Sequence, residues 1–402
     1  MIWWLNKIFG IGKLNIDLSY VASGNLIASV AGVLFWLVLA AILTTEDYGR
    51  LNYYIAIASV LSAASLMGLA TTVTAYVARG NEKIQYQANL LVLVSNSIVF
   101  LLLLLFMKYI PVSILLIGLS FFAMSVAEHL GRKLYRKYFF LVVTERVSQI
   151  ALSVLLYLLI GLDGLLIGYG LAALVFSYRF FKTFSKFSFS VSELRQKFSF
   201  TKYVYPMKVS EALNIHVDKL IIAPLFGFHI LGLYQLGFQA LMFLTVIPTS
   251  LFEYLLPQES SGVERKKVRL GAFITSIIFA IIFSAISPLV IRGLFPNYVE
   301  AIEATQIMIF AIIPMTVNSI IRARLLGMER SKPVFVGAMI YLGTLPPMLY
   351  LLGGTFGLIG LAISVVISLT IQSLYLWGMN SVVNRTMRGP DGSGKTDDSQ
   401  HT

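Results

Sequence analysis

The amino-acid sequence predicts an all-α polytopic membrane protein with twelve transmembrane helices, arranged as two six-helix bundles related by a parallel duplication. The first observation behind this fold class is the composition. Of the 402 residues, 57% are hydrophobic and 12% are charged, which is more apolar surface than the core of a soluble protein encloses. The other observations are the regular recurrence of long apolar segments and the likeness between the two predicted bundles, residues 18–180 and 203–379.

The apolar segments are about 20 residues long, which suffices to cross a hydrocarbon core of ~30 Å as a helix. No soluble domain of ordinary size fits between them. The chain has no cysteine, so disulfides, thiolate metal sites and cysteine nucleophiles are excluded. The predicted spans are 18–43, 50–70, 88–107, 110–128, 146–161, 163–179, 203–226, 231–256, 270–291, 301–321, 333–352 and 355–378.

The distribution of Lys and Arg predicts the orientation of these spans. Of the 31 basic residues, 26 fall in the even-numbered connections and the two termini, whereas the opposite side has only Arg50, Lys108 and Arg292. Basic residues concentrate on the cytoplasmic side of membrane proteins. We therefore expect a protein of the cytoplasmic (inner) membrane with both termini in the cytoplasm. Its net charge of +12 then faces membrane lipids, and no nucleic-acid partner is expected.

Three segments lie outside the predicted bundles. Residues 1–17 carry Trp3 and Trp4 and are expected at the membrane interface, where tryptophans concentrate. Residues 181–202 alternate basic and aromatic side chains, which predicts an amphipathic cytoplasmic linker on the membrane surface. Residues 380–402 form a polar tail predicted to be disordered. The "GSGK" in that tail lacks the strand and helix of a phosphate-binding loop, so no ATPase is predicted.

Short similarities at equivalent places indicate the duplication. Gly49 follows the first predicted helix and matches Gly232, which follows the seventh, 183 positions later. "YLLIGLDGLL" at 157–166 resembles "YLLGGTFGLI" at 350–359, at an offset of 193. Because six crossings are an even number, both halves enter the membrane in the same direction. A functional site is then expected between them near mid-depth, as in transporters.

The predicted span 203–226 concentrates ionisable groups, although a charge near the centre of an isolated span costs about 2.5–3.5 kcal/mol. Successive helical residues advance by about 100°, which places five polar side chains on one arc of about 140° and a histidine just beside it. The stripe should face protein or water. A water-filled cavity between the bundles would account for it, and so would ion pairs near the two membrane surfaces. The six residues are Lys208, Glu211, Asn214, His216, Asp218 and Lys219.

Fainter polar positions add candidates for binding a polar substrate. Hydrogen bonds between helices are the alternative explanation for each of them. Glu128 and His129 close the span 110–128 and are expected in a solvated cytoplasmic turn. The added candidates are Asn25, Gln235, Gln239 and Arg322.

The beginning of the chain carries a family resemblance. It has "SGN" at 23–25 in the first helix, "EDYGRLNY" at 46–53 in the following turn and "GLATTVTAYVARG" at 68–80. Residues 18–80 resemble the Wzx-like polysaccharide biosynthesis proteins, the lipid-linked oligosaccharide flippases of the multidrug/oligosaccharidyl-lipid/polysaccharide exporter (MOP) superfamily. The duplicated plan and the basic linker extend the resemblance over nearly the whole chain. It implies the MATE-like exporter fold, a V-shaped pair of six-helix bundles.

The resemblance also implies a function. Such a protein turns over an isoprenoid-phosphate-linked oligosaccharide from the cytoplasmic to the outer leaflet by alternating access. Lys208, Asn214 and Lys219 would contact the headgroup, while Glu211 and Asp218 would couple the cycle to Na⁺ or H⁺. No other cofactor and no metal site is expected. The partners are then the lipid-linked oligosaccharide, membrane lipids and the glycan assembly machinery.

One departure from the family affects the phosphate contact. Lipid II flippases carry arginines within the first helix, whereas Ser19–Leu43 contains none. A phosphate contact would therefore come from Lys208, Lys219 or Arg322.

Two other functions remain open. A cation-coupled multidrug antiporter of the same superfamily would have the same architecture. A membrane glycan polymerase or ligase would be an enzyme, and such enzymes usually need a long extracytoplasmic catalytic loop. The predicted outer connections are short, and the four histidines form no HExxH motif. With no catalytic constellation outside the membrane, we expect a protein that is not an enzyme.

Overall fold

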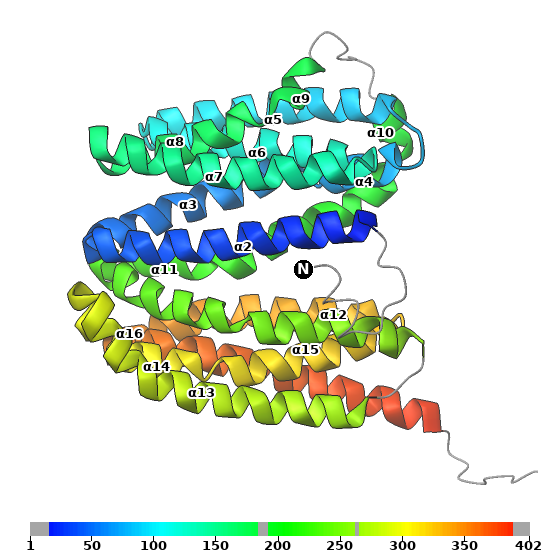
Figure 1. Ribbon diagram of the computed structural model, residues 1–402. Coiled ribbons are helices and arrows are strands. Elements are labelled where there is room, and N and C mark those ends of the chain that lie inside the picture. Colours follow the sequence, from blue (N-terminus) through cyan, green and yellow to red (C-terminus); the bar gives the residue numbers. More distant parts are fainter. Residues whose placement is uncertain (1–15, 184–191, 262–264, 389–402) are drawn as a thin grey trace, which may run out of the picture. The chain divides into compact units, whose positions relative to one another are not determined.

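The structure, a computed structural model, describes residues 16–183, 192–261 and 265–388 (Figure 1). All regular secondary structure in these ranges is helical, which confirms the predicted all-α class. The helices are α2 (Ile16–Ile42), α3 (Thr45–Ser65), α4 (Leu69–Val77), α5 (Lys83–Phe106), α6 (Ile110–Gly131), α7 (Tyr135–Ile160), α8 (Leu162–Val175), α9 (Tyr178–Lys182), α10 (Ser192–Gln196), α11 (Phe198–Leu244), α12 (Val246–Ser260), α13 (Lys266–Leu294), η2 (Pro296–Ala301), α14 (Ile302–Ile309), α15 (Ile312–Gly327) and α16 (Ser331–Arg388).

Among the described residues, eight helices are long and apolar enough to cross a membrane. The number is nine if α3 and α4, which meet at an angle of 52°, form one bent span. The chain is therefore a multi-pass membrane protein. The predicted count of twelve spans stays a prediction, because length and composition alone do not divide the longest helices.

Two helices are too long for a single crossing. At 1.5 Å per residue, the 47 residues of α11 and the 58 residues of α16 extend about 70 and 87 Å, more than twice a hydrocarbon core. Each contains a glycine outside the helical region, Gly227 (φ 87°, ψ 167°) in α11 and Gly357 (φ 57°, ψ −135°) in α16. Both breaks fall close to the boundaries predicted between the seventh and eighth and the eleventh and twelfth spans.

Several helices extend beyond the predicted spans. Helix α7 begins at Tyr135 rather than at residue 146, and α16 continues to Arg388, past the predicted bundle end at residue 379. Hydropathy detects only the apolar part of a helix, whereas both extensions carry basic side chains. The predicted segments 1–17, 181–202 and 380–402 lie only partly within the described residues.

The described residues form two compact units. The N-terminal unit runs to Gln239 and also takes in Leu294–Tyr298, and the C-terminal unit comprises Ala240–Gly293 and the residues from Val299 onward. The first part of α11 therefore belongs to the N-terminal unit. The bundle boundary predicted at 202/203 lies inside this unit, and the two-bundle division stays a prediction.

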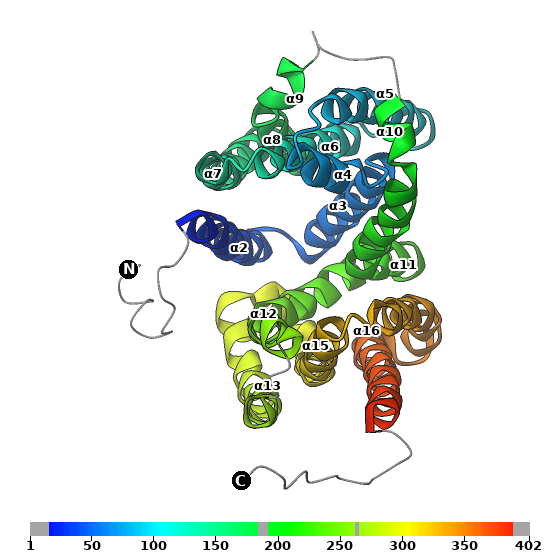
Figure 2. The ribbon, with the colours of Figure 1, turned by 90° about the vertical axis from the view of Figure 1, so that its right-hand side faces the viewer.

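Helix α6 is the centre of the N-terminal unit, where it packs against α3, α4, α5, α7 and α8 (Figure 2). Both ends of the predicted linker also pack onto this unit. Phe181 of α9 lies edge-on to Phe121 of α6, with ring centroids 5.7 Å apart. Leu194 of α10 is buried, and its N–H donates to Gln87 Oε1 of α5 at 3.1 Å. Side-chain packing thus fixes the two ends, while residues 184–191 lie outside the described part of the chain.

The C-terminal unit is held by contacts of α15 with α12 and α16. Asn318 of α15 donates to Gln372 Oε1 at 3.1 Å and accepts from Ser373 Oγ at 2.8 Å. Arg269 forms a 2.6 Å ion pair with the buried Glu259 of α12. These bonds satisfy polar groups inside the unit, as helix–helix packing in a membrane requires.

In the N-terminal unit, α3 and α11 cross at two glycines. A Cβ atom at Gly49 would collide with Phe228 O and lie 2.8 Å from Gly232 N, and one at Gly232 would collide with Thr45 O. Thr45 Oγ1 also hydrogen-bonds His229 Nδ1 at 2.9 Å. The two glycines that mark equivalent places in the predicted repeat thus touch one another, because only a residue without Cβ lets the backbones approach this closely.

One turn recurs in the two units. Gly161 (φ 68°, ψ −146°) lies between α7 and α8 and has nearly the dihedral angles of Gly357 in α16. Three residues later, Gly164 and Gly360 each abut the carbonyl eight residues before them, those of Leu156 and Leu352. The offset between the turns is 196, not the 193 expected from sequence. This likeness supports the duplication, which stays a prediction.

The glycine crossing yields a first prediction. Replacing Gly232 by Ala places a methyl group against Thr45 O, and the helices must separate, at a cost of about 1–3 kcal/mol. We expect a lower thermal unfolding midpoint for the purified protein in detergent. The matched control is Gly32→Ala in α2, where an added Cβ meets no neighbouring atom of the described chain within 4 Å. A Gly232→Ala midpoint equal to that of Gly32→Ala would refute the close crossing.

Candidate functional site

The polar stripe of α11 divides into an exposed part and a buried part. Pro206 and Pro224 lie within this helix. Each proline removes one backbone hydrogen bond, so the carbonyls of Lys202 and Leu220 are released from the helical ladder. Between the two prolines lie all six predicted stripe residues.

The exposed part is an ion pair about three turns after the start of α11. Lys208 Nζ lies 2.7 Å from Glu211 Oε2, with 39% and 54% of the two side chains exposed. The pair has the i,i+3 spacing that brings side chains together on a helix. Both groups remain accessible to a ligand in spite of the pairing.

The buried part is a closed polar cluster. Asp218 and Lys219 are each 3% exposed. Lys219 Nζ donates to Ile215 O at 2.9 Å and to the two carboxylate oxygens of Asp218 at 3.0 and 3.1 Å. Tyr234 Oη donates to Asp218 Oδ2 at 2.9 Å, and the ring of Phe238 lies 4.0 Å from the ammonium. These contacts engage the ammonium and both carboxylate oxygens.

The buried cluster changes the interpretation of the stripe. The sequence left a water-filled cavity and an ion pair as alternatives for Asp218 and Lys219; protein covers both side chains, and the contacts given above all lie within α11, which fits the ion pair. The ion pair explains how two charges are accommodated in a membrane helix, because each compensates the other and receives further hydrogen bonds. The segment before Gly227 holds the pair, and the segment after it supplies Tyr234 and Phe238, so the cluster also fastens the two halves of α11 together.

Asn214 and His216 lie between the two pairs. Asn214 Oδ1 and His216 Nδ1 are buried, and neither has a hydrogen-bond partner in the part of the chain that the structure describes. A buried polar atom without a partner costs about 1–3 kcal/mol. Within the stripe, these two atoms can therefore each form a hydrogen bond with a polar ligand without giving up a partner among the described residues.

The remaining predicted residues lie in different surroundings. Asn25 of α2 accepts a 2.6 Å hydrogen bond from Tyr138 Oη of α7, so it serves helix packing. Gln235 is buried, and Gln239 is half-buried. Arg322 belongs to the C-terminal unit, where its guanidinium lies 5.5 Å from the ring centroid of Phe252. Of the predicted set, the structure brings together two pairs, Lys208 with Glu211 and Asp218 with Lys219.

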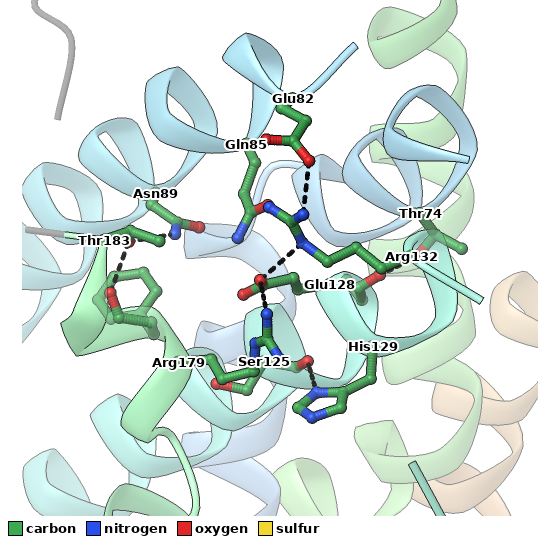
Figure 3. Close-up of polar contacts among 12 residues, drawn as sticks. Thr74, Glu82, Gln85, Asn89, Ser125, Glu128, His129, Arg132, Arg179 and Thr183 are labelled. Atoms are coloured by element: carbon green, nitrogen blue, oxygen red, sulfur yellow. Dashed lines mark hydrogen bonds and ion pairs between the residues drawn. The ribbon is translucent and has the colours of Figure 1, made fainter. Parts of the chain in front are cut away.

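A second ionic cluster lies at the end of α6, where a solvated turn was expected. That expectation is wrong, because Glu128 is 3% exposed and His129 is 1% exposed. Figure 3 shows the guanidinium groups of Arg132 and Arg179 both directed at the Glu128 carboxylate, at 2.9 and 2.7 Å. Arg132 also bonds Glu82 Oε1 at 2.5 Å.

The cluster joins three elements of the N-terminal unit, α5, α6 and α9. Glu128 and Arg132 belong to the end of α6, Glu82 precedes α5, and Arg179 belongs to α9 (Figure 3). A carboxylate in the last turn of a helix is unfavourable beside the helix dipole, so Glu128 needs these cations. The sequence carries one signal for the cluster, the i,i+4 spacing of Glu128 and Arg132. Nothing in the spacing identifies Arg179, because packing of α9 onto α6 brings it there.

Comparison with solved structures gives the fold a context. The lipid II flippase MurJ, in an inward closed conformation, matches with a TM-score of 0.75 and 13% identity over 90% of this chain and 87% of that chain. An inward-facing multidrug resistance MATE family transporter of the MOP superfamily matches with a TM-score of 0.67 and 14% identity. The match covers 89% of this chain and 96% of that chain. An outward-facing structure of a multidrug resistance MATE family transporter matches with a TM-score of 0.58 and 14% identity. The match covers 92% of this chain and 96% of that chain.

These likenesses establish that the chain has the fold shared by MurJ and the MATE transporters. They confirm the predicted MATE-like fold and agree with the resemblance to flippases of the MOP superfamily. No protein-family model matches the sequence, and no curated protein matches it.

The buried pair of α11 yields a second prediction. Replacing Lys219 by Met leaves the Asp218 carboxylate buried without its cation, at a cost of about 3–5 kcal/mol. The double variant Asp218→Asn/Lys219→Met should recover part of this loss. Thermal unfolding of the purified protein measures both. Lys208→Met is the control in the same helix, since an exposed pair contributes only about 0–1 kcal/mol. Equal midpoints for the two lysine variants would contradict the closed cluster.

The ionic cluster of α6 yields a third prediction. Glu128→Gln removes the charge that Arg132 and Arg179 share, and two partly buried guanidinium groups then repel one another. We expect a lower unfolding midpoint and faster proteolysis near α9. The control is Glu82→Gln, which removes a carboxylate that also contacts Arg132 but whose side chain is 53% exposed. If both variants lose the same stability, Glu128 is not the centre of the cluster.

Proposed function

We propose that this protein is a flippase that moves an isoprenoid-phosphate-linked oligosaccharide across the cytoplasmic membrane by alternating access. The observation that carries the proposal is the match to the lipid II flippase MurJ, with a TM-score of 0.75 over 90% of the chain. The neighbours of this fold include inward-facing and outward-facing structures of a transporter, which supports alternating access as the mechanism. In this proposal both termini are cytoplasmic and the protein is not an enzyme.

A physical argument connects the α11 stripe with such a substrate. A phosphate and sugar hydroxyls that enter hydrocarbon lose their water partners, at a cost of several kcal/mol for each uncompensated group. Protein groups along the path must replace those partners, while the isoprenoid tail remains in lipid. The stripe offers a cation, a carboxylate, an amide and an imidazole within three helical turns.

We assign the headgroup contacts to one exposed residue of the stripe and to two residues with an unpartnered polar atom among the described residues. Lys208 is the candidate for the phosphate, because its ammonium is exposed and has one partner that the substrate can displace. Asn214 and His216 are candidates for sugar hydroxyls, since Asn214 Oδ1 and His216 Nδ1 have no hydrogen-bond partner among the described residues. Glu211 is a better candidate than Asp218 for binding Na⁺ or H⁺, because the Asp218 carboxylate is already occupied.

Arg322 remains a second candidate for the phosphate in the C-terminal unit. The glycan assembly machinery that makes and uses the lipid-linked sugar is the expected partner in the cell. The multidrug antiporter is the competing function, supported by the match to a multidrug resistance MATE family transporter with a TM-score of 0.67.

Deletion of the gene tests the proposal. We expect an isoprenoid-linked sugar to accumulate on the cytoplasmic leaflet and surface glycan to be lost, measured by mass spectrometry of extracted lipids and by leaflet-selective labelling. Complementation with Lys208→Gln should lower delivery about 10-fold or more, because a charge-assisted hydrogen bond contributes about 1.5–3 kcal/mol. The matched control is Lys332→Gln, which removes an exposed lysine at the beginning of α16.

One result would reject the proposed function, and another would reject only the assigned phosphate contact. Normal surface glycan in the deletion strain, together with increased sensitivity to amphiphilic cations, would favour the antiporter. Full delivery by Lys208→Gln would leave flipping in place and remove the assigned phosphate contact.

A further inference from the structure

A pocket of about 500 Å³ lies at one end of the N-terminal unit, apart from the α11 stripe and the α6 cluster. The pocket lies between the beginning of α3 and the junction of α7 with α8. Arg50, Tyr54, Tyr109, Asp163 and Phe228 line it, together with two aliphatic side chains. The distribution of Lys and Arg predicts that this end faces away from the cytoplasm.

Aromatic rings form one wall of the pocket. The ring centroids of Tyr54 and Tyr109 are 4.4 Å apart, and that of Phe228 is 6.5 Å from Tyr54. Arg50 lies over the Phe228 ring at 5.5 Å and pairs with Glu46 at 2.9 Å. These contacts come from three separate segments of the chain, so tertiary packing builds the wall.

The polar groups of the pocket are held in place. Tyr109 Oη donates to Asp163 Oδ1. The other oxygen of this exposed carboxylate, Oδ2, can then accept a hydrogen bond from a ligand. Burial, together with this hydrogen bond to Asp163, raises the pKa of Tyr109 above its ordinary value, so the phenol keeps its proton at neutral pH. Arg50 is half-exposed and keeps donors beyond the one used by Glu46.

Charge and shape together select the ligand. A cation in the pocket would lie beside Arg50, and an anion would lie beside Asp163. A neutral ligand that donates to the carboxylate and accepts from the guanidinium avoids both repulsions. The aromatic wall adds apolar area that a flat face with C–H groups covers, and a pyranose ring offers such a face as well as hydroxyls around its edge.

We propose that this pocket binds a neutral sugar ring, and that it receives the glycan of the transported lipid at the exit side of the membrane. The second half of the statement rests on the proposed function. The crossing at Gly49 and Gly232 supports the assignment, because it brings Phe228 of α11 beside Arg50 of α3 and thereby completes the pocket.

Sugar retention by the full-length protein in nanodiscs tests the pocket. The probe is the mixture of lipid-free oligosaccharides released by mild acid from the lipid-linked sugar pool of the cells that make this protein. Mass spectrometry measures what the protein retains after washing. We expect the wild type to retain sugar, and Asp163→Asn and Tyr54→Ala to retain at least about 10-fold less. Asp163→Asn keeps an oxygen for Tyr109, so the fold should be unaffected.

The matched control is Lys108→Gln, which changes an exposed residue next to Tyr109 that does not line the pocket. This variant should retain sugar as the wild type does. The proposal is overturned if the wild type retains no sugar, or if Asp163→Asn and Tyr54→Ala both retain as much as it does. Retention of tetraphenylphosphonium through these residues, in place of sugar, would overturn it too.

Translocation of lipid-linked sugar by the same proteins in sealed vesicles separates this inference from the proposed function. Translocation without sugar retention rejects the pocket and leaves the flippase intact. Sugar retention through Asp163 and Tyr54 without translocation supports the pocket as a sugar site and rejects the flippase.

Discussion

The architecture of the N-terminal unit depends on the close crossing of α3 and α11 at Gly49 and Gly232. At this point the two backbones approach so closely that a single methyl group would collide with a carbonyl oxygen. The crossing has two consequences along α11. It attaches the segment with the polar stripe to the N-terminal unit, and it places Phe228 beside Arg50. The helix that the sequence assigns to the second bundle is thus joined to the first through a contact between two backbones.

The second constraint is that a charge covered by protein needs a partner. Lys219 is covered and paired with Asp218, Glu128 is covered and paired with two arginines, and Glu259 is covered and paired with Arg269. Lys208 and Glu211 are also paired but remain exposed. This difference separates pairs that are closed to a ligand from the pair that a ligand can reach. Closed pairs hold helices together and offer nothing to a ligand, whereas an open pair can exchange its partner for a phosphate or an ion. The accessible stripe residues are therefore the better candidates for transport.

The two proposed sites of the N-terminal unit differ in chemistry as the two parts of a lipid-linked sugar do. The stripe has an accessible ammonium and carboxylate, which suit a charged phosphate and a coupling ion. The pocket lined by Arg50 and Asp163 has aromatic rings and one charge of each sign, which suit a neutral sugar. Hydrogen bonds from protein would replace water for the headgroup during its passage. Aromatic contact would then hold the glycan after its passage, when the headgroup again meets water.

The sequence by itself determined the class of this protein, because the length of apolar segments and the bias of basic residues follow directly from the thickness and the charge of a membrane. It also located the breaks near Gly227 and Gly357 and the helix on which polar groups gather. It placed Glu128 and His129 wrongly in a solvated turn, and it left open whether Asp218 and Lys219 line a cavity or form an ion pair covered by protein. Only the tertiary structure decided these points, since exposure depends on which side chains from distant segments arrive at a residue. Tyr234 closes the Asp218 cluster, Arg179 neutralises Glu128, and Phe228 completes the pocket beside Arg50. Hydropathy and helical periodicity contain no information about such contacts between distant segments.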